Sequence, residues 1–123
     1  MEFLNEVFKT NGRLNRLRYF KYQVILALAS ALISLVFGIV GQVLFGDAEN
    51  FLVMAPAGIC SLVAGIGGIM LAIRRLHDLN KSGWFMLLSL VPLVNVIFGL
   101  YLLFAAGTRG WNEYGADPLA NEY

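Results

Sequence analysis

The sequence has little charge for its length. Only 14% of its 123 residues are charged and 59% are hydrophobic, whereas about a quarter of the residues in a soluble domain are charged. A water-soluble fold would have too few polar residues to cover its surface, and a large exposed apolar patch drives association. The composition therefore excludes an ordinary soluble domain and predicts a surface covered largely by lipid.

Cysteine and histidine are nearly absent. The single cysteine, Cys60, lies in an apolar run, so there is no disulfide framework and no cysteine pair for a metal site. The single histidine, His77, could act as a general acid or base, but no cysteine, second histidine or paired carboxylates lie near it. We therefore expect no enzymatic activity, no cofactor and no bound metal.

Three long stretches lack charged residues: 22–45, 51–73 and 84–106. A helix of about 20 residues spans a hydrocarbon core roughly 30 Å thick, so each stretch is long enough to cross a bilayer. A cleavable signal peptide is a competing interpretation of the first stretch, but the apolar part of a signal is only about 7–15 residues long. We predict an all-α fold, a small multi-pass transmembrane helical bundle that forms a single domain over residues 1–123.

The absence of Asp, Glu, Lys, Arg and His from these stretches also limits function. Such residues are costly in hydrocarbon and mark proton relays and ion pathways, so a proton-coupled transporter of ordinary design is disfavoured. Small residues, in contrast, recur at helical spacing and let helix backbones approach closely. Their lines favour packing within the bundle, and a homo-oligomer through these faces is the alternative. The lines in the second stretch are Ala57, Ser61 and Gly65, and Ala64, Gly68 and Ala72, and the first stretch has a shorter line of Ser30, Ser34 and Gly38.

The basic residues predict an orientation. Eight of the nine lie before the first stretch or in the segment 74–83, and Lys and Arg are retained on the cytoplasmic side of a membrane. Two successive spans place both segments on one side, so we expect the amino terminus and residues 74–83 in the cytoplasm. The loop 46–50 has two acidic residues and no base, and we expect it outside.

The first segment, 1–21, is basic and amphipathic. Phe3 with Val7, and Leu4 with Phe8, lie four residues apart, which predicts a short interfacial helix. A mixture of bases and aromatic residues then precedes the first span. Bases at this position interact with anionic lipid at about 1 kcal/mol each.

The third stretch, 84–106, is interrupted near its middle by Pro92 and Asn95. A proline removes a backbone hydrogen bond and kinks a helix, so we favour one kinked span, which would place the polar tail 107–123 outside. A re-entrant hairpin that turns at Pro92–Asn95 is the alternative, although its turn would have to be buried in protein or wetted. A small channel or transport component with a path at this break is the alternative function.

The segment 74–83 has the most polar chemistry. If the helix continues past Ile73, Arg74 lies three and four residues before His77 and Asp78, so these side chains share a face and can pair. Paired arginines also recognise phosphate or carboxylate groups bidentately. We therefore expect a non-enzymatic membrane protein that binds anionic lipid headgroups or an acidic partner, and no nucleic acid.

Several polar motifs together resemble a bacterial inner-membrane family catalogued as domain of unknown function 805. They are Gly12-Arg13 with Arg16 and Tyr19-Phe20, the run Arg74-Arg75-Leu76-His77-Asp78, the triplet Ser82-Gly83-Trp84, and the closing Gly107-x-x-Gly110-x-Asn112-x-Tyr114-Gly115-x-Asp117-Pro118. The resemblance implies a small multi-pass protein of the bacterial cytoplasmic membrane with no established activity. With a re-entrant third segment, the motifs would meet and form one site. The candidate headgroup- or partner-binding residues are Arg13, Arg16, Arg74, Arg75, His77, Asp78, Asn112 and Asp117.

Overall fold

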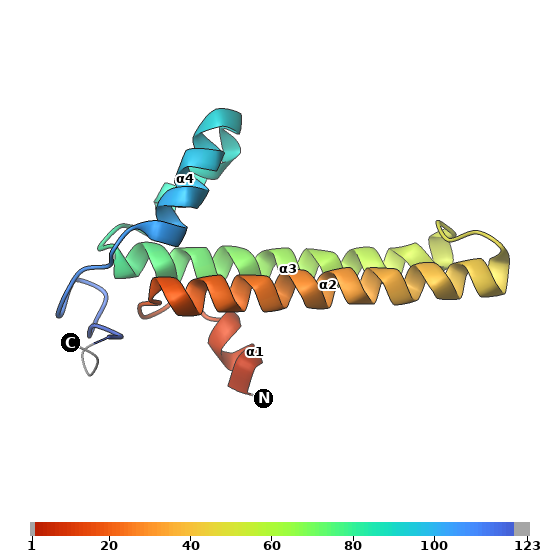
Figure 1. The fold of residues 1–123 in the computed structure, drawn as a ribbon, viewed down its shortest axis with the longest axis horizontal. Coiled ribbons are helices and arrows are strands. Elements are labelled where there is room, and N and C mark those ends of the chain that lie inside the picture. The colour runs from red at the N-terminus through yellow and green to blue at the C-terminus, as the bar shows by residue number, and fades with distance from the viewer. Residues whose placement is uncertain (1, 120–123) are drawn as a thin grey trace. The chain divides into compact units, whose positions relative to one another are not determined.

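The computed structural model describes residues 2–119, without the side chain of Glu2, so the extreme ends of the predicted segments 1–21 and 107–123 lie outside it. Over this range the regular elements are helices, and Asn112 and Gly115 form only an isolated β-bridge. The prediction of an all-α fold is confirmed. The elements are α1 (Glu2–Val7), α2 (Arg16–Phe45), α3 (Phe51–Asp78), the 3₁₀ helix η1 (Gly83–Leu90) and α4 (Pro92–Phe104) (Figure 1).

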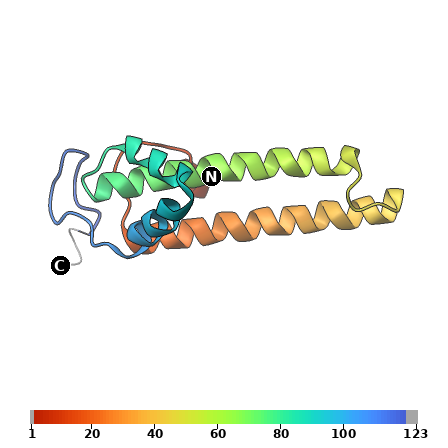
Figure 2. The same cartoon turned by 90° about the horizontal axis from the view of Figure 1, so that it is seen from above.

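The described chain divides into two compact units, of which Val24–Gly67 is one. This unit is a helical hairpin in which parts of α2 and α3 lie side by side (Figure 2). The turn is tight because Gly46 adopts φ 65° and Gly41 leaves room for the loop backbone, where a Cβ would lie 2.8 Å from the Asp47 carbonyl oxygen. Asn50 then caps α3 by accepting a hydrogen bond from Leu52 N at 2.9 Å.

The two long helices have apolar surfaces that protein does not cover. In the described chain, α2 and α3 are the helices long and apolar enough to cross a membrane, and only 11% and 22% of their most apolar windows are buried. A core helix of a soluble protein would be mostly buried, whereas a helix that is apolar on all sides and exposed requires lipid. The hairpin therefore has the surface of a membrane segment.

Some residues of the small-residue lines pack within the hairpin, and others face open space. Ser30 and Ser61 face each other across the hairpin with their hydroxyl oxygens 3.4 Å apart, and Ala57 is buried. A Cβ added at Gly38 or Gly65, in contrast, would meet no other atom within 4 Å. Packing within the chain therefore accounts for part of each line, and oligomerisation stays a prediction.

The second unit comprises the rest of the described chain and begins with α1 and the start of α2. The predicted amino-terminal helix is present, and its Val7 is fully buried while Phe3 packs edge-on against Tyr22 with ring centroids 5.6 Å apart. Asn15 caps α2 by accepting a hydrogen bond from Arg18 N at 2.8 Å. Helix α2 therefore begins at Arg16, six residues before the uncharged stretch.

Helix α3 continues past the uncharged stretch to Asp78 and ends in a Schellman motif. Lys81 N donates to the Leu76 carbonyl at 2.8 Å and Asn80 N to the His77 carbonyl at 3.0 Å. Asn80 takes the left-handed conformation that this motif requires, with φ 59°. As a result, the run from Arg74 to Asp78 occupies the last turns of a helix rather than a loop.

The third apolar stretch is broken into two elements. Extended backbone at Val91 separates η1 from α4, and Pro92 stands in the first turn of α4, where its missing N–H costs nothing. Helix α4 has 13 residues, about 20 Å of rise and less than a bilayer core. Its end returns to the end of α3, where Thr108 N donates to the Asp78 carbonyl at 2.7 Å.

The favoured single kinked helix is therefore wrong, and the backbone forms the helical hairpin of the alternative, whose re-entry into a membrane stays a prediction. Both ends of the broken segment lie at the end of α3, since η1 follows Ser82 and the end of α4 contacts Arg75. The break lies just before Pro92, so the proline begins a new helix rather than kinking one. This arrangement brings residues 107–117 to the amino-terminal segment.

Candidate functional site

Two buried arginines share one buried aspartate at the end of α3. Arg75 Nη1 lies 2.6 Å from Asp78 Oδ2, and Arg13 Nη2 lies 3.0 Å from Asp78 Oδ1. The side chains of Arg13, Arg75 and Asp78 are exposed by only 1%, 0% and 4%. Buried charges of this kind are tolerated only when they are paired and hydrogen-bonded. We call these three residues, together with residues 107–117 that surround them, the polar junction.

Arg13 joins the amino-terminal segment to the tail. Its guanidinium donates to Asp78 Oδ1 and to the backbone carbonyls of Thr108, Gly110 and Gly115, the last two at 2.5 and 3.2 Å. A guanidinium has five N–H donors in a fixed planar fork, and the contacts of Arg13 use its three nitrogens. It therefore holds three backbone groups and one carboxylate at the same time.

Arg75 joins α3 to the end of α4. Its Nε donates to the Leu102 carbonyl at 2.7 Å, and its Nη2 donates to the carbonyl of Ala105. The last carbonyls of a helix have no partner within the helix, and a cation near them is favourable because it lies at the negative end of the helix dipole. Arg75 therefore holds the re-entrant segment at its returning end.

Arg74 binds α1 instead of Asp78, which corrects the pairing expected from helical spacing. Its Nη1 donates to the Glu6 carbonyl at 2.5 Å, and its Nη2 lies 3.5 Å from Glu6 Oε2. Burial acts to raise the pKa of the Glu6 carboxyl, but Lys9 and Arg74 outweigh it, so the pKa is lowered from its usual value. Arg74 Nε is buried and makes no hydrogen bond within the described chain.

His77 and Asn112 join the last turn of α3 to the tail turn. The His77 ring stacks on Tyr114 with centroids 4.0 Å apart and an interplanar angle of 4°, and its Nδ1 lies 3.0 Å from the Gly12 carbonyl oxygen. Asn112 Nδ2 donates to the His77 carbonyl at 2.9 Å. Nδ1 and the ring face of His77 thus contact the segment before α2 and the tail turn, so the side chain helps to hold these segments at the end of α3.

The closing motif shapes the tail turn itself. Asn112 Oδ1 accepts a hydrogen bond from Tyr114 N at 2.8 Å, and Asp117 Oδ2 accepts one from Gly110 N at 2.8 Å. Gly110 and Gly115 adopt φ values of 79° and 128°, which glycine reaches without steric cost. The carbonyls of both glycines accept hydrogen bonds from Arg13, so the motif presents its backbone to the junction.

At Gly107 the tail packs closely against the carboxylate of Asp78. A Cβ at this position would overlap Asp78 Oδ2 and lie 2.6 Å from its Cγ, and the carboxylate cannot move away because two arginines hold it. We expect Gly107→Ala to lower the free energy of unfolding by about 1–3 kcal/mol, as overpacking does, in chemical unfolding of the protein in detergent. Gly99→Ala is the matched control, because a Cβ there meets no other atom within 4 Å and alanine favours a helix. Equal stability of the two variants would contradict this packing.

Arg16 differs from the other candidate arginines because it is exposed. Its Nη1 donates to the Phe104 carbonyl at 2.9 Å, a contact between the start of α2 and the end of α4. Beside it lies an apolar groove of about 430 Å³ lined by Leu17, Phe20, Leu103 and Phe104. Arg16 thus stands at the edge of an apolar surface, with most of its donors unused by the described chain.

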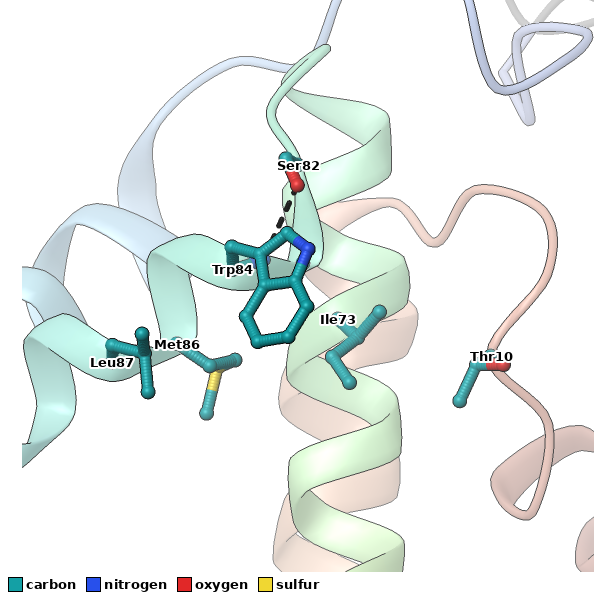
Figure 3. Close-up of a pocket in the computed structure, with 7 residues that line it drawn as sticks. Thr10, Ile73, Ser82, Trp84, Met86 and Leu87 are labelled. Atoms are coloured by element: carbon teal, nitrogen blue, oxygen red, sulfur yellow. Dashed lines mark hydrogen bonds between the residues drawn. The ribbon is translucent and has the colours of Figure 1, made fainter.

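A second hollow, of about 450 Å³, lies where η1 leaves the end of α3 (Figure 3). The close-up shows the Trp84 ring beside Ile73, and Ser82 accepts a hydrogen bond from Trp84 N at 3.3 Å. Gly83 allows this approach, since a Cβ there would lie 3.1 Å from Ile73 Cγ2. The labelled lining residues have no charged group, so this hollow offers nothing that would select an anion.

The structure thus brings six of the eight predicted residues into or directly against the polar junction. Arg74 instead binds Glu6 of α1, and the exposed Arg16 binds the carbonyl of Phe104 at the end of α4. Sequence reasoning missed Glu6, Gly107 and Tyr114 as partners. Gly107 and Tyr114 stand within or beside the closing motif, whereas Glu6 had no signal beyond its place in the amphipathic segment. Among the described residues, no group of three or more His, Cys, Asp or Glu could hold a metal ion.

The family model for "Protein of unknown function (DUF805)" matches residues 7–116, a range that contains the polar motifs of the junction except Asp117 and Pro118 at the end of the closing motif. The chain belongs to this family. The DUF805 match agrees with the resemblance seen in the motifs, and its limits fall close to Arg13 at one end and Asp117 at the other.

Similar proteins of this kind are described as inner membrane proteins. The chain is 33% identical to "Inner membrane protein YhaI" of Escherichia coli strain K12 over 108 residues, which cover 88% of this chain and 84% of the relative. It is 42% identical to "Inner membrane protein YhaH" of the same strain over 45 residues, or 37% of each chain. No solved structure matches the chain. Together with the two long exposed apolar helices, these relatives identify an uncharacterised membrane protein.

Proposed function

We propose that this is a non-enzymatic, multi-pass protein of the bacterial cytoplasmic membrane that binds anionic lipid headgroups through the exposed bases of α2. The amino terminus and the polar junction lie on the cytoplasmic side in this proposal. The sequence motifs predict Arg13, Arg74 and Arg75 as headgroup ligands as well. Because their guanidinium groups are engaged within the chain, we assign them to holding the junction and give headgroup binding to the exposed bases.

One observation supports this assignment. Arg16, Arg18 and Lys21 are exposed on the first turns of α2, directly before the uncharged stretch, and none forms an ion pair with a carboxylate of the described chain. A base in this position next to an anionic membrane contributes about 1 kcal/mol, and the charged lipid headgroup lies at the same level. Three unpaired bases in two helical turns are therefore suited to collect anionic headgroups.

The test compares two double variants that remove the same charge from different places. Arg16→Gln with Arg18→Gln removes two bases of α2, whereas Lys9→Gln with Lys81→Gln removes two bases elsewhere in the same unit. We expect native mass spectrometry of the purified protein to show selective retention of phosphatidylglycerol over phosphatidylcholine. The α2 double variant should lower that selectivity about tenfold or more, since two bases contribute about 2 kcal/mol, and the Lys9/Lys81 variant much less. Equal retention of both lipids by the wild-type protein would overturn the proposal.

A further inference from the structure

The groove beside Arg16 combines a cation with an apolar surface. It lies between the start of α2, which contributes Leu17 and Phe20, and the end of α4, which contributes Leu103 and Phe104. Its volume of about 430 Å³ falls within the range of small-molecule sites. Leu17 and Phe104 are 74% and 69% exposed, so these large apolar side chains are left without cover by the described chain.

A hydrogen bond positions the Arg16 side chain at the edge of this groove. The contact between its Nη1 and the Phe104 carbonyl, at 2.9 Å, ties it to the end of α4 and leaves the Nε and Nη2 edge of the guanidinium unused. That edge has the parallel pair of donors that matches a phosphate bidentately. A positioned guanidinium and an adjoining apolar groove form two complementary parts of one binding surface.

The charges near the groove favour an anion from outside the chain, because no carboxylate of the described chain is paired with Arg16. In the described chain the buried Asp78 is already held by Arg13 and Arg75, while Arg16 has no carboxylate partner. Arg16 therefore brings to the groove a positive charge that no carboxylate of the described chain balances. An incoming phosphate would therefore meet an uncompensated positive potential.

We propose that this groove binds a single anionic phospholipid, with its phosphate on Arg16 and the upper part of one acyl chain along Leu17, Phe20, Leu103 and Phe104. The inference rests on the proposed headgroup-binding function and names the lipid class and the place of its chain. In a phospholipid the negative phosphate and the apolar acyl chains are joined through one glycerol unit, so one molecule can occupy both parts of this surface. Each CH₂ group of the acyl chain that is buried in the groove contributes to the binding free energy, as in other lipid contacts. The acyl chain and the phosphate therefore both stabilise the complex.

The experiment places a fluorescent reporter in the groove. In a Trp84→Phe, Trp111→Phe background, both native tryptophans being 79% exposed, Phe104→Trp is reconstituted with phospholipids that have brominated acyl chains. We expect brominated phosphatidylglycerol to quench this tryptophan at a mole fraction about tenfold lower than brominated phosphatidylcholine, because a charge-assisted hydrogen bond is worth about that factor. Leu17→Trp reports the same groove from α2 and replaces the first reporter if that variant does not fold.

Matched variants separate this site from general attraction. Arg16→Gln should remove the selectivity, while Arg18→Gln, which makes the same charge change two residues along α2 and away from the groove, should retain it. Leu100→Trp, on α4 but outside the groove, should be quenched equally by both lipids. Equal quenching of the groove reporter by both lipids, or equal loss in both arginine variants, would overturn the inference.

Two further measurements distinguish the sources of binding. Glycerol phosphate at millimolar concentration should not restore the unquenched signal, and if it does, the site binds phosphate alone and the acyl-chain assignment is wrong. Native mass spectrometry of the same protein checks overall lipid selectivity. Selective retention of phosphatidylglycerol without selective quenching in the groove would overturn this inference and leave the proposed function in place. Loss of both would overturn the two together.

Discussion

Replacing Asp78 by asparagine is expected to lower the free energy of unfolding by about 3–5 kcal/mol. The carboxylate is the charged partner of both Arg13 and Arg75, and all three side chains are almost completely buried. Asparagine preserves the shape but leaves two buried guanidinium groups without a negative charge, and such uncompensated charges are strongly destabilising. Unfolding of the purified protein in detergent, followed by its circular dichroism, measures the change.

Asp47→Asn is the matched control for this variant. Asp47 lies in the exposed loop between α2 and α3, where its Oδ1 accepts a hydrogen bond from Glu49 N at 2.9 Å that asparagine can also accept. Surface substitutions of this kind usually change stability by less than about 0.5 kcal/mol. If Asp78→Asn were as stable as the control, the buried ion pairs would not hold the fold together.

Arg13→Lys is expected to loosen the tail while leaving the two long helices intact. Lysine preserves the charge but has one nitrogen with three donors, so it cannot reach Asp78 and the three tail carbonyls at the same time. Carbonyls that lose their donor in a buried site cost about 1–3 kcal/mol. Backbone amides of residues 105–119 should therefore exchange with deuterium about ten- to a hundredfold faster.

Two comparisons show whether the effect arises from the fork of donors. Arg18→Lys makes the same change at an exposed position of α2 and should leave exchange unchanged. Within the Arg13→Lys protein, peptides from Val24–Gly67 should exchange as in the wild type, since that part of the chain is a separate compact unit. Unchanged protection of the tail would show that the charge of Arg13 matters and its geometry does not.

Asp78→Asn and Arg13→Lys both test whether the buried ion pairs of the polar junction hold the surrounding segments together. The polar motifs of the family meet at the end of α3, and each of them contributes groups that hold another segment: Arg13 the tail, Arg75 the end of α4, and Arg74 the helix α1. Residues with so many partners inside the chain are suited to fix an architecture. In the proposed function, recognition of lipid is therefore assigned to exposed bases such as Arg16.

The sequence predicts the long helices well because their signal is local. An uncharged stretch of more than 20 residues is long enough to cross a bilayer whatever the rest of the chain does, and the structure places Phe51 at the start of α3 as expected. Helix ends were predicted less well. Helix α2 starts at Arg16 because Asn15 caps it, and α3 continues to Asp78 because Asn80 forms the Schellman turn.

The third stretch shows where local reasoning was insufficient. Pro92 and Asn95 marked a break, but the same proline is compatible with a kink inside a helix or with the first turn of a new one. The choice depended on whether the carbonyls at the end of α4 had partners. Arg75 provides them at the carbonyls of Leu102 and Ala105, and no periodicity along the stretch contains that information.

By itself the sequence determined that this is an all-α membrane protein, since apolar length and low charge follow from the residues alone. Only the tertiary structure decided which arginine pairs with which acid. Helical spacing proposed Arg74 with Asp78, whereas the partners of Asp78 are its near neighbour Arg75 and Arg13, 65 residues away. The physical reason is that buried charges must all be neutralised together, so each pairing depends on where the tail, α1 and α4 come to lie.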